Sequence, residues 1–419
     1  MQEVSRYAVG LDVGTTTVRT VVAHVETPGQ NPTIIGIGEQ ENNGMRKGTV
    51  VNLVNVAKAI DKALESAERM SGHQIHAASV SINGSHIVGM GSRGVIAVGT
   101  GGHEINEDDL ARVEDAATVV QLPANRDILD VTPRAYQLDG QENIKDPLGM
   151  TGVRLEVDAY VITALAPHVK NLHKACEMTE TTVHQTVLAG LASARSVVSE
   201  QQMENGVVLI DFGGATTNIA VYEEGDLQHI AVLPVGSVNV TNDLAIGLKT
   251  ELHVAEQVKL EHAVAVAKLR KDGEETVTVK VGKETHEFSC DDIDMIVDAR
   301  LEEIFELVNQ ELKKIGRSAK LPGGAVITGG GAQLRGIADY AREALQLSAR
   351  VAKPDGFGGM SEQVANPAFS AAVGLMLLDL ESGPAASQHG QKQGARGGQG
   401  TTINSVTQKI TDIFGKFRS

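Results

Sequence analysis

The sequence predicts an α/β protein made of two duplicated halves, with a compact α+β subdomain inserted in the first half. Two observations lead to this prediction. The segment YAVGLDVGTTTVRTVVA at 7–23 matches GVVLIDFGGATTNIAVY at 206–222 in its order of apolar, aspartate, glycine and threonine residues. The block at 83–161 interrupts the first half with strands and a helix of its own. Self-similarity of this kind indicates repeated structural units.

Each half opens with a strand, a tight turn and a second strand, at 7–23 and at 207–222. Between these hairpins the apolar spacing predicts helices at 53–70, 106–120, 168–177 and 188–198, and strands at 80–98, 127–136, 154–164 and 182–187. After the second hairpin it predicts helices at 237–247 and 253–263, a strand pair at 274–288, a long helix at 291–315 and an apolar strand at 325–331.

The composition excludes several classes of function. The chain has 419 residues, a net charge of −16, no tryptophan and 3% aromatic residues, which argues against general nucleic-acid binding. Only Cys176 and Cys290 are present, so we expect no disulfide framework or cysteine-rich metal site, and a reducing cytoplasm suits the chain. We expect no signal peptide, and the longest apolar run, at 371–378, is too short to span a bilayer. Any membrane contact is therefore expected to be peripheral.

The turn after the first strand has the chemistry of a phosphate site. Glycine lets backbone N–H groups approach phosphate oxygens, threonine hydroxyls add hydrogen bonds, and an aspartate at a strand end suits Mg²⁺. The second half repeats this turn, so we expect the two turns to clamp the β- and γ-phosphates of a nucleotide. The expected phosphate contacts are Gly14, Thr15, Thr16, Thr17, Asp211, Gly213, Gly214, Ala215, Thr216 and Thr217, and the expected Mg²⁺ carboxylates, acting through water, are Asp12 and Asp211.

A single turn of this kind is more often an ordinary hairpin turn, and its repetition in matching contexts is what favours phosphate binding. Neither copy is a P-loop, and no dinucleotide-binding G-x-G-x-x-G stands between a strand and a helix. A third segment, the strand at 326–328 followed by Gly329, Gly330 and Gly331, offers a flat backbone surface for a nucleoside. Alone it is a common strand–helix joint, but as the third part of an ordered set it predicts ATP with Mg²⁺.

The C-terminal end combines a flexible linker with an amphipathic helix. Residues 381–402 are rich in Gly, Gln, Ser and Ala, a composition that cannot bury a core. The apolar residues that follow fall within a helical arc of roughly 100°. Such a basic helix suits the interface of an anionic membrane, and docking on the protein's own body or on a partner is the alternative. The expected membrane contacts are Ile403, Val406, Lys409, Ile410, Ile413, Phe414, Lys416, Phe417 and Arg418.

In this order the three motifs resemble the actin/Hsp70/sugar-kinase superfamily, which implies actin-like (ribonuclease H-like) halves around a nucleotide cleft. Within that superfamily the chain resembles the FtsA family of bacterial cell-division proteins over nearly its whole length. The segments that carry this resemblance are GMRKGTVVNL at 44–53, NIKDPLGMTGVRLEVDAYVITA at 143–164, VLAGLASA at 187–194 and AEQVKLEHA at 255–263. The inserted block stands where that family carries its characteristic subdomain.

The resemblance implies further site residues and partners. Glu256 and Lys259 would contact the ribose and adenine, although by themselves they indicate a solvated helix face. Arg300, by itself most simply a solvated charge, would contact the C-terminal tail of the tubulin-like partner FtsZ. The resemblance also implies an actin-like polymer, a peripheral location on the inner face of the cell membrane at the division site, and recruitment of late division proteins. No residue is assigned to activate water, so hydrolysis is expected to be slow and the nucleotide to act as an assembly switch.

The resemblance also implies subdomain boundaries. Subdomain 1A would comprise 1–82 and 162–205, and the inserted subdomain 1C would comprise 83–161. Subdomain 2A would comprise 206–240 and 312–364, with subdomain 2B at 241–311. A return helix to 1A at 365–380, the linker at 381–402 and the membrane helix at 403–419 would complete the chain.

Two other functions stay open on the sequence alone. A pilus-assembly actin-like protein would carry an inserted subdomain of the same type, but the tethered basic helix argues against it. A small-molecule kinase of the superfamily would need a substrate-binding carboxylate that the sequence does not identify, and it would leave residues 403–418 unexplained.

Overall fold

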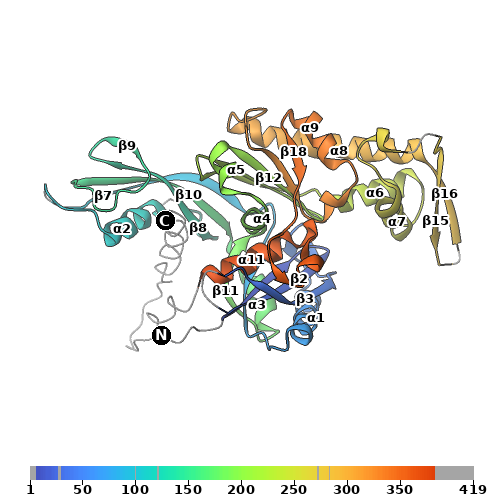
Figure 1. Cartoon of the computed structure of the whole chain (residues 1–419), viewed down its shortest axis with the longest axis horizontal. Coiled ribbons are helices and arrows are strands. Elements are labelled where there is room, and N and C mark those ends of the chain that lie inside the picture. The colour runs from blue at the N-terminus through green and yellow to red at the C-terminus, as the bar shows by residue number, and fades with distance from the viewer. Residues whose placement is uncertain are drawn as a thin grey trace. The chain divides into compact units, whose positions relative to one another are not determined.

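The structure, a computed structural model, describes residues 6–26, 30–99, 101–119, 122–270, 273–282 and 284–382. The chain divides into two compact units (Figure 1). Among the described residues, unit 1 comprises those within 6–85 and 170–377, and unit 2 comprises those within 86–169 and 378–382. The predicted membrane helix at 403–419, and all of the predicted linker beyond residue 382, lie outside the described residues.

Unit 1 contains two large sheets, and the first is built around the first predicted hairpin. Its strand order is β11-β6-β1-β2-β3-β19. Strands β1, β2 and β3 form an antiparallel meander, and β6 lies parallel to β1 on the other side. The strands are β1 (Arg6–Val13), β2 (Thr17–Val25), β3 (Thr33–Glu41), β6 (Ala77–Ile82), β11 (Thr182–Leu188) and β19 (Gly358–Gly359). A two-residue pair, β4 (Met45–Arg46) and β5 (Thr49–Val50), follows β3.

The second large sheet repeats this topology with the order β14-β13-β12-β17-β18. Here β12, β13 and β14 form the antiparallel meander, and β17 lies parallel to β12. The strands are β12 (Val207–Phe212), β13 (Thr217–Glu223), β14 (Asp226–Leu233), β17 (Gly324–Thr328) and β18 (Ala349–Val351). The two halves therefore share a strand order as well as a sequence pattern, which confirms the predicted duplication.

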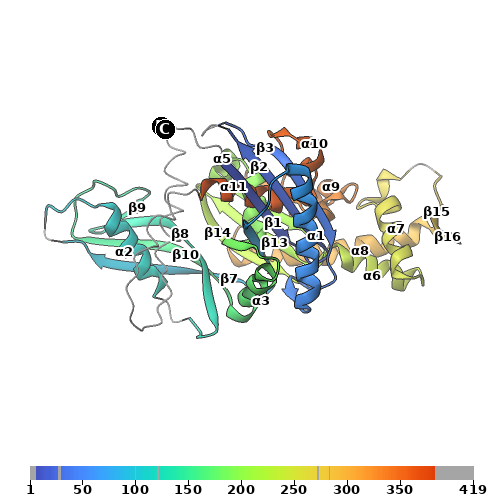
Figure 2. The same ribbon diagram turned by 90° about the horizontal axis from the view of Figure 1, so that it is seen from below.

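Helix α1 (Leu53–Ser71) packs directly on the first sheet (Figure 2). The Asn52 side chain accepts a hydrogen bond from the backbone N–H of Asn55, and Gly72 ends the helix with a left-handed φ of 70°. Its buried face includes Val56, Ile60 and Leu64, at the spacing of one helical face. The approach is close because a Cβ on Gly38 of β3 would lie 1.8 Å from the Ala63 carbonyl oxygen.

The other helices that accompany the two sheets are short. Helix α11 carries the most apolar of these segments, and Ala372, Val373, Leu375 and Met376 on it are fully buried. The bounds are α3 (Ala166–Glu177), α4 (Ala189–Val197), α5 (Glu200–Asn205), α9 (Ile337–Leu345), α10 (Ser361–Val364) and α11 (Ser370–Glu381), with 3₁₀ turns η2 (Gly330–Gln333) and η3 (Pro367–Phe369).

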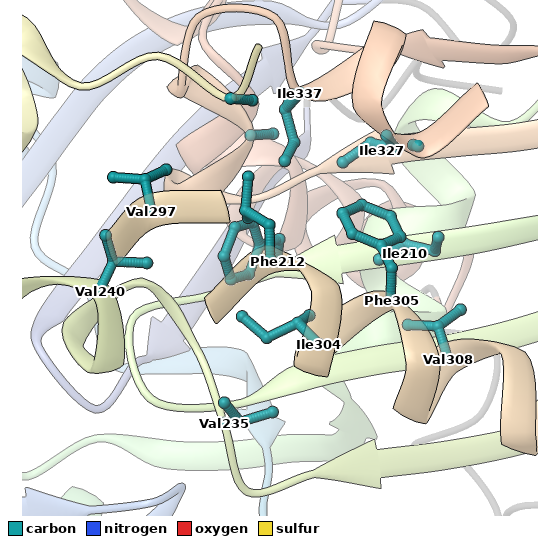
Figure 3. Close-up of a cluster of buried hydrophobic side chains, with 14 of the residues drawn as sticks. Ile210, Phe212, Val235, Val240, Val297, Ile304, Phe305, Val308, Ile327 and Ile337 are labelled. Carbon is teal, nitrogen blue, oxygen red and sulfur yellow. The ribbon is translucent and has the colours of Figure 1, made fainter. Parts of the chain in front are cut away.

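A helical region follows β14 and shares a core with the second sheet. The long helix α8 turns Val297, Ile304, Phe305 and Val308 toward apolar residues of the second sheet such as Ile210 (Figure 3). The elements of this region are α6 (Ser237–Gly247), α7 (Leu252–His262), η1 (Ala267–Leu269), β15 (Thr276–Val281), β16 (Glu284–Ser289) and α8 (Cys290–Lys314). The 3.6-residue periodicity that predicts a helix at 291–315 is thus explained by one continuous buried stripe.

Unit 2 is an antiparallel sheet with one helix against it. The strand order is β7-β10-β8-β9, and helix α2 begins at a capping box in which Asn106 and Asp109 bond to each other's backbone N–H groups. The elements are β7 (Val88–Ala97), α2 (Glu107–Thr118), β8 (Arg126–Leu138), β9 (Gln141–Ile144) and β10 (Arg154–Leu165). Val113, Val157 and Val161 lie in its separate hydrophobic core.

The structure corrects several sequence-based boundaries. The strand-like stretch predicted at 80–98 is two strands, because β6 ends at Ile82 in unit 1 and β7 begins at Val88 in unit 2. Strands β3, β9 and β14 and helix α9 were not predicted, since their apolar alternation is short or interrupted by glycine and charge. Among the described residues, no helix combines the length and apolar character that crossing a bilayer demands.

Candidate nucleotide-binding cleft

A cleft of about 480 Å³ lies within unit 1 and is lined by all three glycine-containing motifs. Most of the predicted nucleotide contacts are on its wall. Two are not among its lining residues: Ala215 and Thr217. Thr217 is fully buried and its hydroxyl donates to the Val235 carbonyl oxygen at 2.8 Å. Because side chains alternate along a strand, Thr216 faces the cleft while Thr217 faces the core.

The first turn, between β1 and β2, is held by the segment at 42–48, to which the sequence analysis gave no role in the nucleotide site. The Asn42 side chain donates to the Gly14 carbonyl oxygen at 2.8 Å, and the Asn42 backbone N–H donates to the Thr16 carbonyl oxygen at 2.8 Å. The backbone N–H of Gly48 donates to the Thr15 hydroxyl oxygen at 2.9 Å. The Thr15 hydroxyl proton is thereby left to bond a ligand while its oxygen stays anchored.

The second turn, between β12 and β13, is held instead by the start of helix α6. The backbone N–H groups of Ser237 and Val238 donate to the carbonyl oxygens of Gly213 and Gly214 at 3.0 and 2.8 Å. The two turns also meet, since a Cβ on Gly214 would lie 2.7 Å from the Thr16 hydroxyl oxygen. Glycine is therefore required at Gly214 for this close approach.

A side chain from the end of β6 connects the two halves across the cleft. The Asn83 amide nitrogen donates to the Thr216 hydroxyl oxygen at 3.0 Å, and the Asn83 amide oxygen accepts from the Gly84 backbone N–H at 2.8 Å. Sequence reasoning missed Asn83 because nothing in the local pattern places it near the second turn. Its only signal is its position at the end of a strand that enters the cleft.

The two aspartates are held by hydroxyl and amide donors. The Ser81 hydroxyl donates to Asp12 Oδ1 at 2.7 Å, and the Ser193 hydroxyl donates to Asp211 Oδ2 at 3.1 Å. Burial, together with the neighbouring charge of Asp12, raises the pKa of Asp211 to about 7 against the opposing hydrogen bonds from Ser193 and Asn218. Burial also raises the pKa of Asp12, while the Ser81 hydrogen bond and the charge of Arg19 lower it.

This pair of carboxylates fits a divalent cation bound together with a nucleotide. Two acidic groups with raised pKa values lack sufficient compensating positive charge, which a cation would supply. The described residues contain no cluster of three or more His, Cys, Asp or Glu side chains able to hold a metal. Mg²⁺ typically uses one or two protein carboxylates together with waters and phosphate oxygens. The donor set is therefore suited to Mg²⁺ carried by a nucleotide rather than to an independent metal site.

Glu256 and Lys259 lie on helix α7 and line the cleft. The Lys259 ammonium donates to Glu256 Oε2 at 2.7 Å and to the Thr241 hydroxyl oxygen at 2.9 Å, and the Thr241 hydroxyl donates to Glu256 Oε2. The Lys259 side chain is 11% exposed, so the interpretation as a solvated helix face is wrong for this lysine. The arrangement leaves Glu256 with a carboxylate oxygen oriented by two donors.

The third motif ends β17 directly against the second aspartate. Gly329 has a φ of 86°, and a Cβ there would lie 2.4 Å from Asp211 Oδ1 and 2.7 Å from the Phe212 carbonyl oxygen. Gly331 packs on the Phe212 ring, where a Cβ would come within 2.6 Å. A side chain at Gly329 is thus excluded by both conformation and space.

Arg300 lies outside the cleft, on helix α8. Its guanidinium forms hydrogen-bonded ion pairs with Asp243 of α6 and with Glu303, and its side chain is 20% exposed. The interpretation as a simple solvated charge is therefore wrong. Large apolar side chains are exposed on the same two helices, with Ile246 at 76% and Met295 at 65%.

Two sheets of one topology, joined around a cleft that gathers the paired turns, define an actin-like fold with an inserted subdomain. Solved structures agree. The type IV pilus complex PilM–PilN matches with a TM-score of 0.64 at 17% identity, covering 88% of this chain and 97% of that chain. MreB5 of Spiroplasma citri bound to ADP matches with a TM-score of 0.53 at 14% identity, covering 90% and 96%.

Sequence comparison identifies the family. The family model "Cell division protein FtsA" matches residues 208–374, and "SHS2 domain inserted in FTSA" matches residues 84–163. The chain is 38% identical to FtsA of Pseudomonas aeruginosa, with 89% of each chain covered. It is 37% identical to FtsA of Bacillus subtilis, covering 88% of this chain and 82% of that protein, and 33% identical to FtsA of Escherichia coli, covering 90% and 91%. The chain belongs to the FtsA family of cell-division proteins.

Proposed function

We propose that this chain binds ATP with Mg²⁺ in the cleft of unit 1 and uses nucleotide occupancy to control its assembly during cell division. The convergence of both turns, the two aspartates and the Gly329–Gly331 strand end on one cleft carries this proposal. Family membership supports the process in which it acts.

In this proposal each wall of the cleft has a distinct task. Backbone N–H groups and hydroxyls of the turns at 14–17 and 213–216 hold the β- and γ-phosphates. Asp12 and Asp211 hold the cation through water, and the cation offsets phosphate charge. Glu256, oriented by Lys259 and Thr241, accepts from the ribose hydroxyls, and the Gly329–Gly331 backbone carries the nucleoside. We assign no residue to water activation, so the nucleotide acts mainly as an assembly switch.

We extend the proposal to the membrane and to partners. The chain would polymerise head-to-tail through a heterologous contact on the inner face of the cell membrane, anchored by the predicted helix at 403–419. Arg300 and the exposed apolar groups on α6 and α8 would receive the C-terminal tail of FtsZ, with Asp243 exchanged for a carboxylate of the tail. The tethered polymer would then recruit late division proteins. Unit 2 would supply the inserted subdomain 1C, with the boundaries predicted from the sequence.

Co-sedimentation of the full chain with anionic vesicles, with and without Mg-ATP, followed by electron microscopy, tests this function. We expect filaments on vesicles when ATP is present. Phe414→Glu with Phe417→Glu should abolish vesicle binding, because the substitutions introduce negative charge into the apolar stripe of the predicted helix. ATP affinity should be unchanged, because the substitutions lie outside the cleft.

The matched control is Ser405→Glu with Gln408→Glu, which adds the same charge on the polar side of the predicted helix and should weaken binding far less. Monomers that stay free of vesicles, or a double phenylalanine variant that still floats with them, would contradict the anchoring proposal. Absence of ATP binding to the wild-type chain would contradict the nucleotide proposal itself.

A further inference from the structure

The duplication places equivalent residues in a row across each large sheet, at the level of the two aspartates. Each row takes one residue from each of four neighbouring strands. Hydrogen bonding and strand register set the first row as Ser81, Asp12, Arg19 and Glu39. Register sets the second row as Thr328, Asp211, Asn218 and Val232.

The two rows differ at the residue opposite each aspartate. In the second row Asn218 is 1% exposed, and its amide nitrogen donates to Asp211 Oδ2 at 3.3 Å. In the first row Arg19 does not donate to Asp12, and its Nη2 instead donates to Glu39 Oε1 at 2.6 Å. A neutral pair of Asn and Val in one half is thus replaced by a charged pair in the other.

Arg19 lines the cleft and is held there by two contacts. Its guanidinium lies 5.4 Å from the centroid of the Phe369 ring, and Glu39 holds one terminal nitrogen. Its Nε is buried and has no hydrogen-bond partner in the part of the chain that the structure describes. A buried N–H is normally paired, so this side chain has donor capacity that the described protein groups do not use.

Lys259 and Arg335 also line the cleft, but neither has a buried nitrogen without a partner among the described residues. Lys259 is paired with Glu256, and the Arg335 guanidinium donates to the Leu269 carbonyl oxygen. Arg19 lies across the strand pair from Asp12, and its positive charge lowers the pKa of both Asp12 and Asp211. Arg19 therefore places a fixed positive charge beside the two carboxylates.

We infer that Arg19 recognises the terminal phosphate of the bound nucleotide and makes the cleft selective for a triphosphate over a diphosphate. Guanidinium groups bind phosphate oxygens through paired, charge-assisted hydrogen bonds. The extra phosphate of a triphosphate brings negative charge close to two carboxylates, and Arg19 offsets that charge. Phe369 and Glu39 keep the guanidinium in place, which limits the entropy lost on binding. This inference rests on the proposed nucleotide function.

Equilibrium binding of ATP and ADP to the full chain, each with Mg²⁺, tests the inference. The principal variant combines Arg19→Asn with Glu39→Val, which gives the first row the residues that the second row already accommodates. We expect ATP affinity to fall about tenfold or more, as for loss of one charge-assisted contact, and ADP affinity to fall much less. Arg19→Lys should retain part of the ATP preference.

A matched control replaces an Arg–Glu pair outside the cleft. Arg317 donates to Glu223 at 2.7 Å, so Arg317→Asn with Glu223→Val should leave both affinities unchanged. If the Arg19 double variant does not fold, as judged by thermal unfolding, Arg19→Gln is measured in the same way.

The outcomes separate the two proposals. A wild-type chain that binds neither nucleotide contradicts the proposed function and removes the basis of the inference. A wild-type chain that binds nucleotide, with an unchanged ratio of ATP to ADP affinity in the Arg19 variants, overturns the inference and leaves the proposed function standing. An equal loss for both nucleotides also overturns it, since Arg19 would then act on the cleft as a whole.

Discussion

In the first half of unit 1 the turn aspartate has a serine hydroxyl on one side and an arginine on the other, whereas in the second half it lies among neutral groups. The scaffold is the same, with a meander and one parallel strand in each half. Asp12 and Asp211 therefore reach equivalent positions by strand order alone. The difference lies in the neighbouring strands, which place a charged pair beside Asp12 and neutral residues beside Asp211.

The segments that hold the two turns differ as well. A loop at 42–48 donates to the first turn, and the start of helix α6 donates to the second. Movement of one turn would therefore shift a loop, and movement of the other would shift a helix. The two turns thus have two different mechanical connections, which suits the proposed coupling of nucleotide occupancy to assembly.

The largest expected effect concerns the position that follows the second row. Gly329 follows Thr328 of the second row and has a φ of 86°. The equivalent residue in the first half, which follows Ser81 of the first row, is Ile82. Gly329→Ala should lower the free energy of unfolding by about 3 kcal/mol, because it combines left-handed strain with a clash against Asp211. Gly330→Ala is the control, since a Cβ there meets nothing within 4 Å. Urea unfolding of both variants measures the difference in their free energies of unfolding. An equal loss of stability in the two variants would contradict the prediction.

The second largest expected effect concerns the protonation of Asp211. The folded-state pKa of Asp211, about 7, exceeds its ordinary value of 3.8, so the folded chain binds more protons than the unfolded chain between these values. Stability without nucleotide is therefore present at low pH and lost as the pH rises through 7. Asp211→Asn should raise the unfolding free energy at pH 8 by roughly 2 kcal/mol and have little effect near pH 4.

Denaturant unfolding at pH 4, 6 and 8 checks this, with Asp291→Asn on the exposed start of α8 as the control. A variant with the same pH dependence as the wild-type chain would show that Asp211 ionises freely in the folded state.

The smallest expected effect concerns the connection between the halves. Asn83 of the first half is equivalent in position to Gly330 of the second half. Its amide nitrogen donates to the Thr216 hydroxyl oxygen at 3.0 Å. Asn83→Ala should cost about 1 kcal/mol of nucleotide binding, since one neutral hydrogen bond between the halves is lost. Calorimetric titration with ATP measures the affinity, and Asn55→Ala on the exposed face of α1 is the control. An unchanged affinity would show that the two turns are positioned without Asn83.

Local sequence patterns predicted much of the fold. The periodicity of α1 and α8, the two strand–turn–strand segments and the Gly329–Gly331 strand end depend on residues close together in the chain. Strands such as β3 and β14 were missed because their alternation is weak without the partner strands beside them. The interpretation of Arg300 as a solvated charge was wrong because its partner Asp243 is remote in sequence, while the partner contact implied by the resemblance stays a prediction.

The sequence by itself determined the duplication, the family and the aspartates, glycines and threonines of the turns, because backbone turn chemistry needs those residue types at fixed spacing. The tertiary structure decided which side chains complete the cleft. Arg19, Asn42 and Asn83 belong to strands and loops whose patterns are ordinary. Their significance arises where segments far apart in the chain meet, and the burial and charge of those neighbours are set by packing rather than by local sequence.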